Sequence, residues 1–89
     1  MKAFISVIGD DKIGIIYGVT SVLKECNVNV LDINQTLLKE YFAMVMLVDL
    51  ELMTVEFSSL KRMLEDAGKS IGVSIKIQHE NIFSCMHNI

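Results

Sequence analysis

Apolar residues recur along this chain with two different periods, and the order of those periods limits the folds that the chain can adopt. Recurrence at every second position, or an unbroken apolar run, is typical of a strand, whereas recurrence every three to four positions is typical of a helix. In chain order, the patterns predict a strand at 2–8, a helix at 15–26, a strand at 28–38, a strand at 41–50, a helix at 55–69 and a strand at 73–78. The chain therefore runs strand, helix, strand twice over.

Polar residues and glycines separate these segments. Residues 9–14 are predicted to form a loop whose acids suit the capping of a helix N-terminus. Lys39-Glu40 is the short polar break of a hairpin, and Thr54 is expected to be the N-cap of the second helix. Gly68 and Gly72 bracket the end of that helix. Beyond the last strand the apolar residues return to a spacing near four, which suggests a short closing turn.

The order of the elements determines the expected architecture. Two strand-helix-strand halves, at 2–38 and 41–78, place both helices on the same face of one sheet when their crossovers are right-handed. The expected fold is therefore of the α+β class, a ferredoxin-like βαββαβ plait with a four-stranded antiparallel sheet and two helices on one face. A chain of 89 residues has room for one hydrophobic core, so residues 1–89 are predicted to form a single domain.

The third predicted strand carries more apolar surface than two helices can cover. Phe42, Met44 and Met46 lie on one of its faces, and Val45 and Leu47 lie on the other. An uncovered sheet face with such side chains exceeds the apolar patch usual for a soluble monomer. We therefore expect a homo-oligomer, most simply a two-fold dimer, and favour contact between sheet faces over contact between edges. In the alternative, residues 81–89 fold across the face, although nine residues are too few to cover it fully.

Charge and hydropathy exclude two large classes of partner. The net charge is −3, from 11 acidic and 8 basic residues, which disfavours a phosphate-neutralising surface for nucleic acid. The third strand also lacks the pattern of basic residue, glycine and aromatic residue by which such sheets bind RNA. The longest uncharged apolar run, 41–48, has eight residues against the roughly twenty of a membrane span. An acid already at Asp10 argues against a secretion signal, and two cysteines are too few for a disulfide scaffold, so we expect a cytoplasmic protein.

The residues that could support metal binding or catalysis are few. His79, Cys85 and His87 are the candidate metal ligands, but no second pair completes a site, so neither a metal nor a cofactor is expected. No histidine is paired with a cysteine or serine at a spacing that suggests nucleophilic catalysis, so the chain is not expected to be an enzyme. Cys26 lies on the apolar stripe of the first helix and is predicted to be a small core residue.

The loop at 9–14 has the Gly-x4-Gly outline of a phosphate loop but not its chemistry. Ile15 follows where a phosphate loop has lysine, and two acids in the loop would repel phosphate, so nucleotide binding is disfavoured. The loop suits a small molecule better, because N–H groups at a helix N-terminus bind a carboxylate. Gly14 would allow close approach, and Asp10 or Asp11 could hold an ammonium group. Plain helix capping is the alternative.

Two asparagines open the second strand. Asn27 is expected to end the preceding helix in the left-handed conformation. Asn29 has an amide with both donors and acceptors, which suits the main-chain groups of an amino acid. The polar residues that follow, Asp32, Asn34 and Gln35, are expected to be the surface of an edge strand.

Several segments together resemble the ACT domain family. They are Gly9-Asp10-Asp11-Lys12-Ile13-Gly14-Ile15, Asn27-Val28-Asn29-Val30, Asp32-Ile33-Asn34-Gln35-Thr36, Glu40-Tyr41-Phe42 and Ile82-Phe83 with Met86-His87-Asn88-Ile89. The resemblance covers about 2–80 and is closer still to stand-alone bacterial ACT proteins of unassigned function. Those proteins are similar to the ACT domains of the glycine cleavage system transcriptional repressor. The chain departs from the family at Ile13, where proline often precedes the glycine.

The resemblance implies a regulatory module, commonly dimeric, that often binds amino acids at a subunit interface. It places Asp11 on the polar loop residue that contacts ligand, Gly14 on the characteristic glycine, and Ile15 at the start of the helix behind it. Asn29 and Val30 fall on the strand segment that faces the same pocket. The expected function is a sensor of an amino acid or similar metabolite that acts on a partner protein in trans. The alternative is an interaction module that binds a protein without a small ligand.

Overall fold

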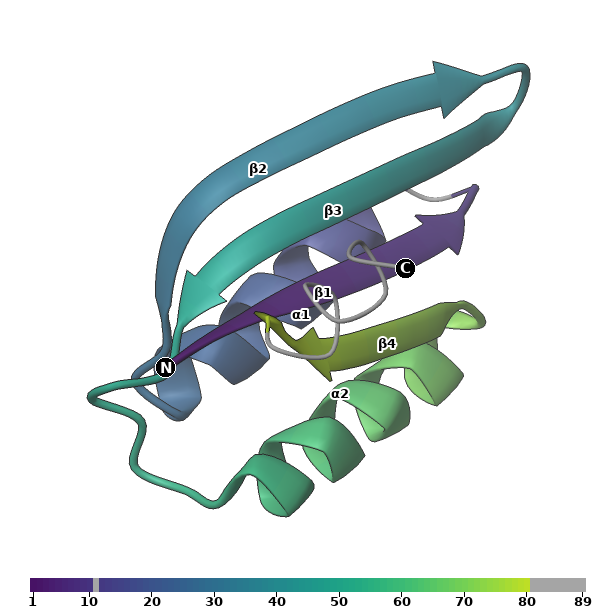
Figure 1. Ribbon diagram of the computed structural model, residues 1–89. Coiled ribbons are helices and arrows are strands. Elements are labelled where there is room, and N and C mark those ends of the chain that lie inside the picture. Colours follow the sequence, from purple (N-terminus) through teal and green to yellow (C-terminus); the bar gives the residue numbers. More distant parts are fainter. Residues whose placement is uncertain (11, 81–89) are drawn as a thin grey trace.

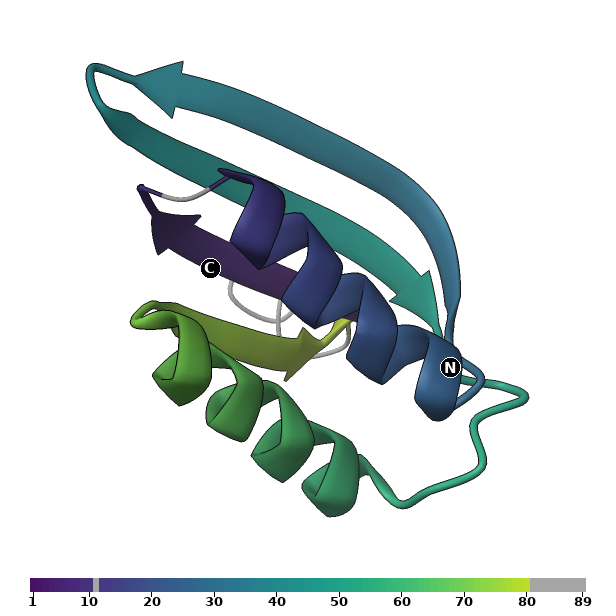
Figure 2. The same cartoon turned by 180° about the vertical axis from the view of Figure 1, so that it is seen from behind.

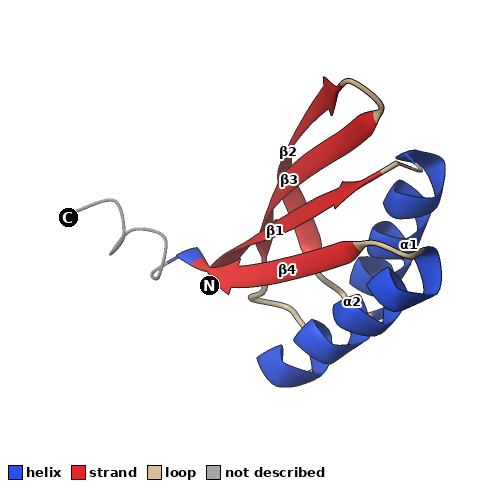
Figure 3. Ribbon diagram, turned by 90° about the vertical axis from the view of Figure 1, so that its right-hand side faces the viewer, coloured by secondary structure: helices blue, strands red, loops and turns tan. Residues whose placement is uncertain are grey.

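The computed structural model describes residues 1–10 and 12–80 and confirms the predicted plait (Figure 1). The elements are β1 (Lys2–Gly9), α1 (Lys12–Glu25), β2 (Asn29–Leu38), β3 (Tyr41–Asp49), α2 (Phe57–Ile71) and β4 (Ser74–His79). The strands form one sheet in the order β2-β3-β1-β4, and each neighbouring pair is antiparallel. Both helices lie on the same face of this sheet (Figure 3). Asp11, the closing turn predicted after the last strand, Cys85 and His87 lie outside the described residues.

The core lies between the sheet and the helices. Ile5 of β1 is paired with Met46 of β3 on one side and with Ile77 of β4 on the other, and these three side chains are buried beneath the helices. From the helices, Ile15 and Val19 of α1 and two leucines of α2 fill the same layer. Because β1 and β3 are the central strands, their helix-facing side chains are almost completely removed from water, which is the source of hydrophobic stabilisation.

The helix boundaries differ from the predicted ones where local chemistry outweighs periodicity. α1 begins at Lys12, three residues before the predicted start, because Ile13 faces solvent and Gly14 has no side chain, so neither residue extends the apolar repeat. Gly14 therefore lies inside the helix and not in a loop. The prediction that Thr54 caps α2 is wrong: the N-cap is Glu56, without a side-chain hydrogen bond, and the Thr54 N–H donates to the Cys26 carbonyl at 3.0 Å.

The predicted end of α2 and the predicted turns are largely confirmed. Gly72 has a φ of 89° and ends α2, with its N–H donating to the Gly68 carbonyl at 2.8 Å. Asn27 has a φ of 58° and ends α1, and its side-chain amide donates to the Leu52 carbonyl at 2.9 Å. Lys39 and Glu40 form the two-residue hairpin turn, with Lys39 at a φ of 58°.

A β-bulge in β2 changes which side chains share a face. Val30 is opposite Val48 and Asp32 is opposite Leu47, so Leu31 is an extra residue in the ladder. Residues directly opposite in a ladder point to the same side of the sheet, so Val30 faces the helices with Val48. Strict alternation along the predicted strand at 28–38 would place Val30 on the same face as Asp32, Asn34 and Thr36, and the inserted Leu31 makes that grouping wrong.

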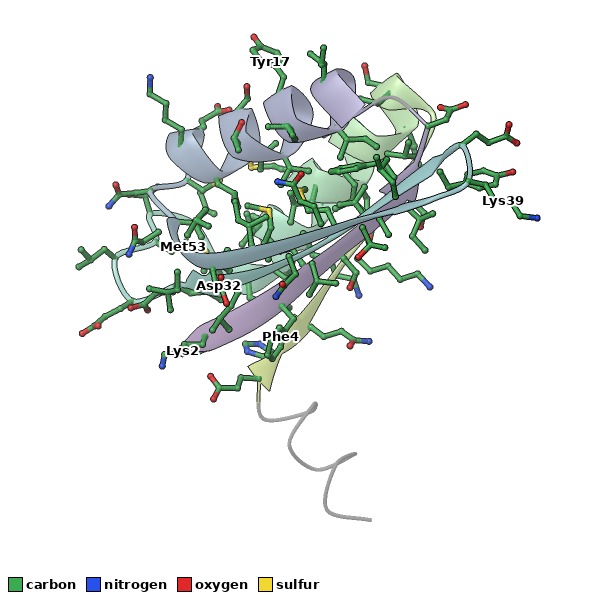
Figure 4. All side chains as sticks on the ribbon, turned by 90° about the horizontal axis from the view of Figure 1, so that it is seen from above. Lys2, Phe4, Tyr17, Asp32, Lys39 and Met53 are labelled. Atoms are coloured by element: carbon green, nitrogen blue, oxygen red, sulfur yellow. The ribbon has the colours of Figure 1, made fainter. Side chains whose placement is uncertain are left out.

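The expected surplus of apolar surface is present, but it is divided between two places. On the sheet face opposite the helices, Phe4 of β1 and Leu47 of β3 are paired across the two strands and half-buried, while Ile8 is 64 % exposed. Figure 4 shows Phe4 on the opposite side of the sheet from Tyr17 of α1. On the helix side, α1 packs over β1 and α2 over β4, which leaves β2 without a helix above it (Figure 2). Leu37 of β2 is therefore 70 % exposed.

Candidate functional site

The turn from β1 into α1 is the first part of the expected site. β1 ends at Gly9, where an added Cβ would lie 2.3 Å from Cγ1 of Val73, so the backbone there packs closely against Val73. Asp10 is exposed, and Ile13 in the first turn of α1 is 82 % exposed. The positive end of the α1 dipole lies at this turn and favours an anionic group such as a carboxylate.

The residues of this turn do not all face solvent. Gly14 is half-buried and lies on the side of α1 nearest α2. Ile15 is fully buried and points into the core, so its side chain supports the turn from beneath. Of the expected site residues at this turn, Asp10 and the backbone near Gly14 are thus accessible.

Asn29 and Val30 lie at the start of β2, beside a separate hollow of about 310 Å³. Its lining residues are Asn27, Val28, Asn29, Asp49, Glu51 and Leu52. Asp49 organises this hollow, because its carboxylate accepts the Glu51 N–H at 3.0 Å and lies 3.9 Å from the N-terminal ammonium of Met1. The hollow therefore combines two amides and two carboxylates at one end of the sheet.

The two parts of the expected site lie at opposite ends of the sheet. Gly9 is paired with Phe42, which is paired with Leu37, so the β1–α1 turn lies beside the far end of β2. Asn29 is paired with Asp49, which is paired with Lys2, at the other end. The 14 residues of α1 separate them by about 21 Å. One copy of the chain therefore does not bring Asp10 and Gly14 together with Asn29 and Val30.

A second hollow, of about 410 Å³, lies between the helices and adjoins the β1–α1 turn. It is lined by Gly14, Tyr17 and Gly18 of α1 and by Ala67, Ser70 and Ile71 of α2. Gly18 brings the helices close, because an added Cβ there would lie 2.5 Å from Cδ1 of Ile71. Sequence reasoning missed Tyr17 and Ser70. The available signal was the Gly14-x3-Gly18 spacing, which puts two small residues one turn apart on the side that meets another helix.

The candidate metal and thiol residues show structural surroundings. Within 1–10 and 12–80, no three His, Cys, Asp or Glu side chains gather as metal ligands would. The His79 ring stacks on Phe57, with centroids 4.0 Å apart. Cys26 is buried, as predicted, with its Sγ 3.6 Å from Sδ of Met63. Burial, and secondarily the charge of Glu25, raises the pKa of this thiol. No described helix is long and apolar enough to cross a membrane.

Comparisons with known proteins agree with the observed fold. The family model described as "ACT domain" matches residues 3–78. A UPF0237 protein of Clostridium acetobutylicum is 54 % identical over 89 residues, which is all of both chains. The solved structure of an ACT domain protein from Streptococcus pneumoniae has a TM-score of 0.80 and 41 % identity, over 93 % of each chain. The regulatory subunit of aspartate kinase from Thermus thermophilus shares the fold, with a TM-score of 0.65 and 24 % identity over 86 % of this chain and 50 % of that one.

Proposed function

Because the chain belongs to the ACT domain family, we propose that it is a regulatory domain that binds an amino acid, or a similar small metabolite, between two copies of itself. ACT domain proteins are regulatory and often bind ligands. In this proposal the ligand changes the geometry or stability of the dimer, and the dimer acts on a partner protein in trans. We call Asp10 and Gly14 at the β1–α1 turn one half-site, and Asn29 and Val30 at the start of β2 the other. The observation that carries the proposal is that these two half-sites lie at opposite ends of the sheet.

A two-fold axis beside β2 would bring the half-sites together. β2 is an edge strand, and two such strands paired antiparallel place the start of one beside the end of the other. The partner's Asn29 would then lie near Leu37, which is next to the β1–α1 turn. The same axis forms an identical second site, so each dimer would bind two ligands.

The surface around β2 favours this edge contact over the stacking of sheet faces. Ile33 and Leu37 point to the helix side of the sheet but lack a helix above them, and Ile13 of α1 is exposed near the same end. A second copy would remove this apolar surface from water, which stabilises association by about 25 cal/mol per Å². Asp32, Asn34 and Thr36 of β2 point to the other side, whereas Gln35 shares the helix side with Ile33 and Leu37.

The chemistry of each half-site indicates where the carboxylate and the ammonium group of the ligand would bind. The carboxylate would lie at the N-terminus of α1, where Gly14 allows close approach. The ammonium would lie near Asp10 and Asp11, and the partner's Asn29 would bridge the two groups through its amide. The partner's Val30 and the buried Ile15 would shape the apolar surroundings. The proposal includes no catalytic step, nucleic acid or metal, and the buried free thiol of Cys26 is in keeping with a cytoplasmic location.

Titration calorimetry against the twenty amino acids tests the proposal. We expect one or a few to bind with dissociation constants from micromolar to millimolar. Asn29→Ala should weaken that binding at least about tenfold, the cost of a hydrogen bond to a charged group. Asn34→Ala is the matched control, because it removes the same amide group from the middle of the same strand, away from the proposed ligand groups. Absence of binding by all twenty would refute amino acid sensing.

The second candidate function is a protein interaction module without a small ligand. The open sheet face favours it, since Phe4, Ile8, Val45 and Leu47 form an apolar centre with polar residues on the flanking strands. In this case ligand-free protein would retain its partner, and Val45→Lys would release it. Retention that depends on an added amino acid would instead support the sensor.

A further inference from the structure

The second edge of the sheet carries a groove of its own. β4 is the edge strand opposite β2, and α2 lies along it (Figure 1). Between them is a groove of about 450 Å³, lined by Phe57, Lys61 and Glu65 of α2 and by β4 from Ile75 to His79. We propose that a second copy of this chain docks here, with its β4 paired antiparallel to the first across a two-fold axis. This contact is distinct from the β2 edge used in the proposed function.

The sequence of β4 selects one register for such a pairing. Residues directly opposite each other point to the same side, so only registers that oppose a residue to itself, or to one an even number away, are allowed. In β4 (Ser74–His79), the two registers with the longest overlap centre on Lys76 or on Ile77. The first opposes two lysine ammonium groups, which is destabilising. The second opposes Lys76 to the partner's Gln78 and Ile77 to the partner's Ile77, without a like-charge pair.

The position of α2 along β4 provides an independent check on this axis. At one end, Gly68 packs over Ile75, where an added Cβ would lie 3.3 Å from Cγ1 of Ile75. At the other end, Phe57 stacks on His79. Ile77 is midway between Ile75 and His79, so an axis through Ile77 crosses α2 about midway between Phe57 and Gly68. That point lies between Lys61 and Glu65.

The charged side chains of α2 in one copy therefore lie opposite side chains of opposite charge on α2 of the partner. Both Lys61 and Glu65 are exposed and line the groove. A two-fold rotation about a point between them places Lys61 opposite the partner's Glu65 and Glu65 opposite the partner's Lys61. The register that avoids lysine repulsion in β4 thus also forms two oppositely charged pairs between the helices. This double agreement identifies a second copy, and not an unrelated peptide, as the occupant.

The two edges together predict growth of the assembly with concentration. A copy paired through β2 on one side and β4 on the other contacts two neighbours, so dimers would join into tetramers and longer ribbons. The β4 contact depends on charge, so added salt should weaken it.

The test isolates the β4 edge with an Ile33→Lys background, which places a charge on the exposed helix side of β2. Sedimentation velocity of this variant should give twice the 10.0 kDa of one chain. Adding Lys61→Glu or Glu65→Lys converts both attractive pairs into repulsive ones and should raise the dissociation constant about tenfold to thirtyfold. The double variant with both changes restores the complementarity and should restore the dimer.

Arg62→Glu is the matched control, because Arg62 is the exposed neighbour of Lys61 and lies outside the groove. It makes the same change of charge and should leave the dimer intact, and circular dichroism checks that each variant remains folded. The proposal is overturned if the Ile33→Lys chain is a monomer at all concentrations up to millimolar. It is equally overturned if the single reversals leave the dimer unchanged, or if the double variant fails to restore it.

Discussion

The Gly68→Ala variant tests how tightly α2 holds β4. Gly68 is buried within α2, and a Cβ added there would lie 2.7 Å from the carbonyl oxygen of Val73 and 3.3 Å from Cγ1 of Ile75. In a helix interior, alanine in place of glycine gains about 1 kcal/mol from propensity. The clash is with backbone that leads directly into β4, so it can be relieved only if α2 and β4 move apart. Overpacking of this kind typically costs roughly 1–3 kcal/mol, and more where backbone must move.

We therefore expect a net loss of about 1–2 kcal/mol in the free energy of unfolding, despite the gain in helix propensity. For a domain of this size, that loss lowers the Tm by roughly 4–15 °C. Urea and thermal unfolding followed by circular dichroism at one fixed protein concentration measure it, since self-association makes stability concentration-dependent.

Gly18→Ala is the matched control for this reasoning. A Cβ at Gly18 would also be close to a neighbour, 2.5 Å from Cδ1 of Ile71, but that atom is the end of a flexible side chain. Ile71 can change rotamer, so the helix gain and the repacking cost should nearly cancel, to within about 1 kcal/mol. A Gly68→Ala protein as stable as the wild type, or one that loses no more than Gly18→Ala, would refute the assignment of Gly68 as the residue that sets the distance between α2 and β4.

Two further changes test local features. Lys39→Gly should raise the free energy of unfolding by about 0.5–1 kcal/mol in urea, because Lys39 has a φ of 58° that glycine adopts without strain; an unchanged midpoint would mean that the turn is not strained. In a Cys85→Ser chain, the native Cys26 thiol should react with a thiol reagent far more slowly than in urea, because burial raises its pKa and blocks access. Because the pKa of Cys26 is higher in the folded state, the folded state keeps the thiol proton to a higher pH than the unfolded state does. The stability that Cys26 contributes should therefore fall as the pH rises past the ordinary thiol pKa of 9.0. A free energy of unfolding that rises over this range would contradict the raised pKa.

Much of the fold could be predicted because it depends on local patterns. The apolar repeat from Ile15 to Cys26 marks the sheet-facing stripe of α1, and the alternation of β3 marks its buried methionines. The first turn of α1 escaped the same reasoning, because Ile13 faces solvent and leaves no apolar repeat. Thr54 has the chemistry of an N-cap, yet its N–H is held by the Cys26 carbonyl from another part of the chain.

The candidate site was predictable in its residue types and not in its arrangement. The glycine and acids after β1, and the amide of Asn29, are recognisable as candidate ligand-binding groups from their chemistry alone. The burial of Ile15 beneath the turn was also predictable, because Ile15 begins the sheet-facing apolar stripe of α1. The hollow beside Tyr17 and Ser70 depends on how the two helices meet: the Gly14-x3-Gly18 spacing marks the side of α1 that is involved, but it does not indicate which residues of α2 lie opposite.

The order of strands and helices, the single core and the excess of apolar surface were determined by the sequence itself, since each depends on the period with which side chains alternate between solvent and core. Only the tertiary structure decided where that excess lies and which functional groups are neighbours. An extra residue at Leu31 turned Val30 toward the helices, and the antiparallel course of α1 carried Asn29 to the far end of the sheet from Gly14. Both depend on contacts between segments distant in sequence, and periodicity within one segment carries no information about those contacts.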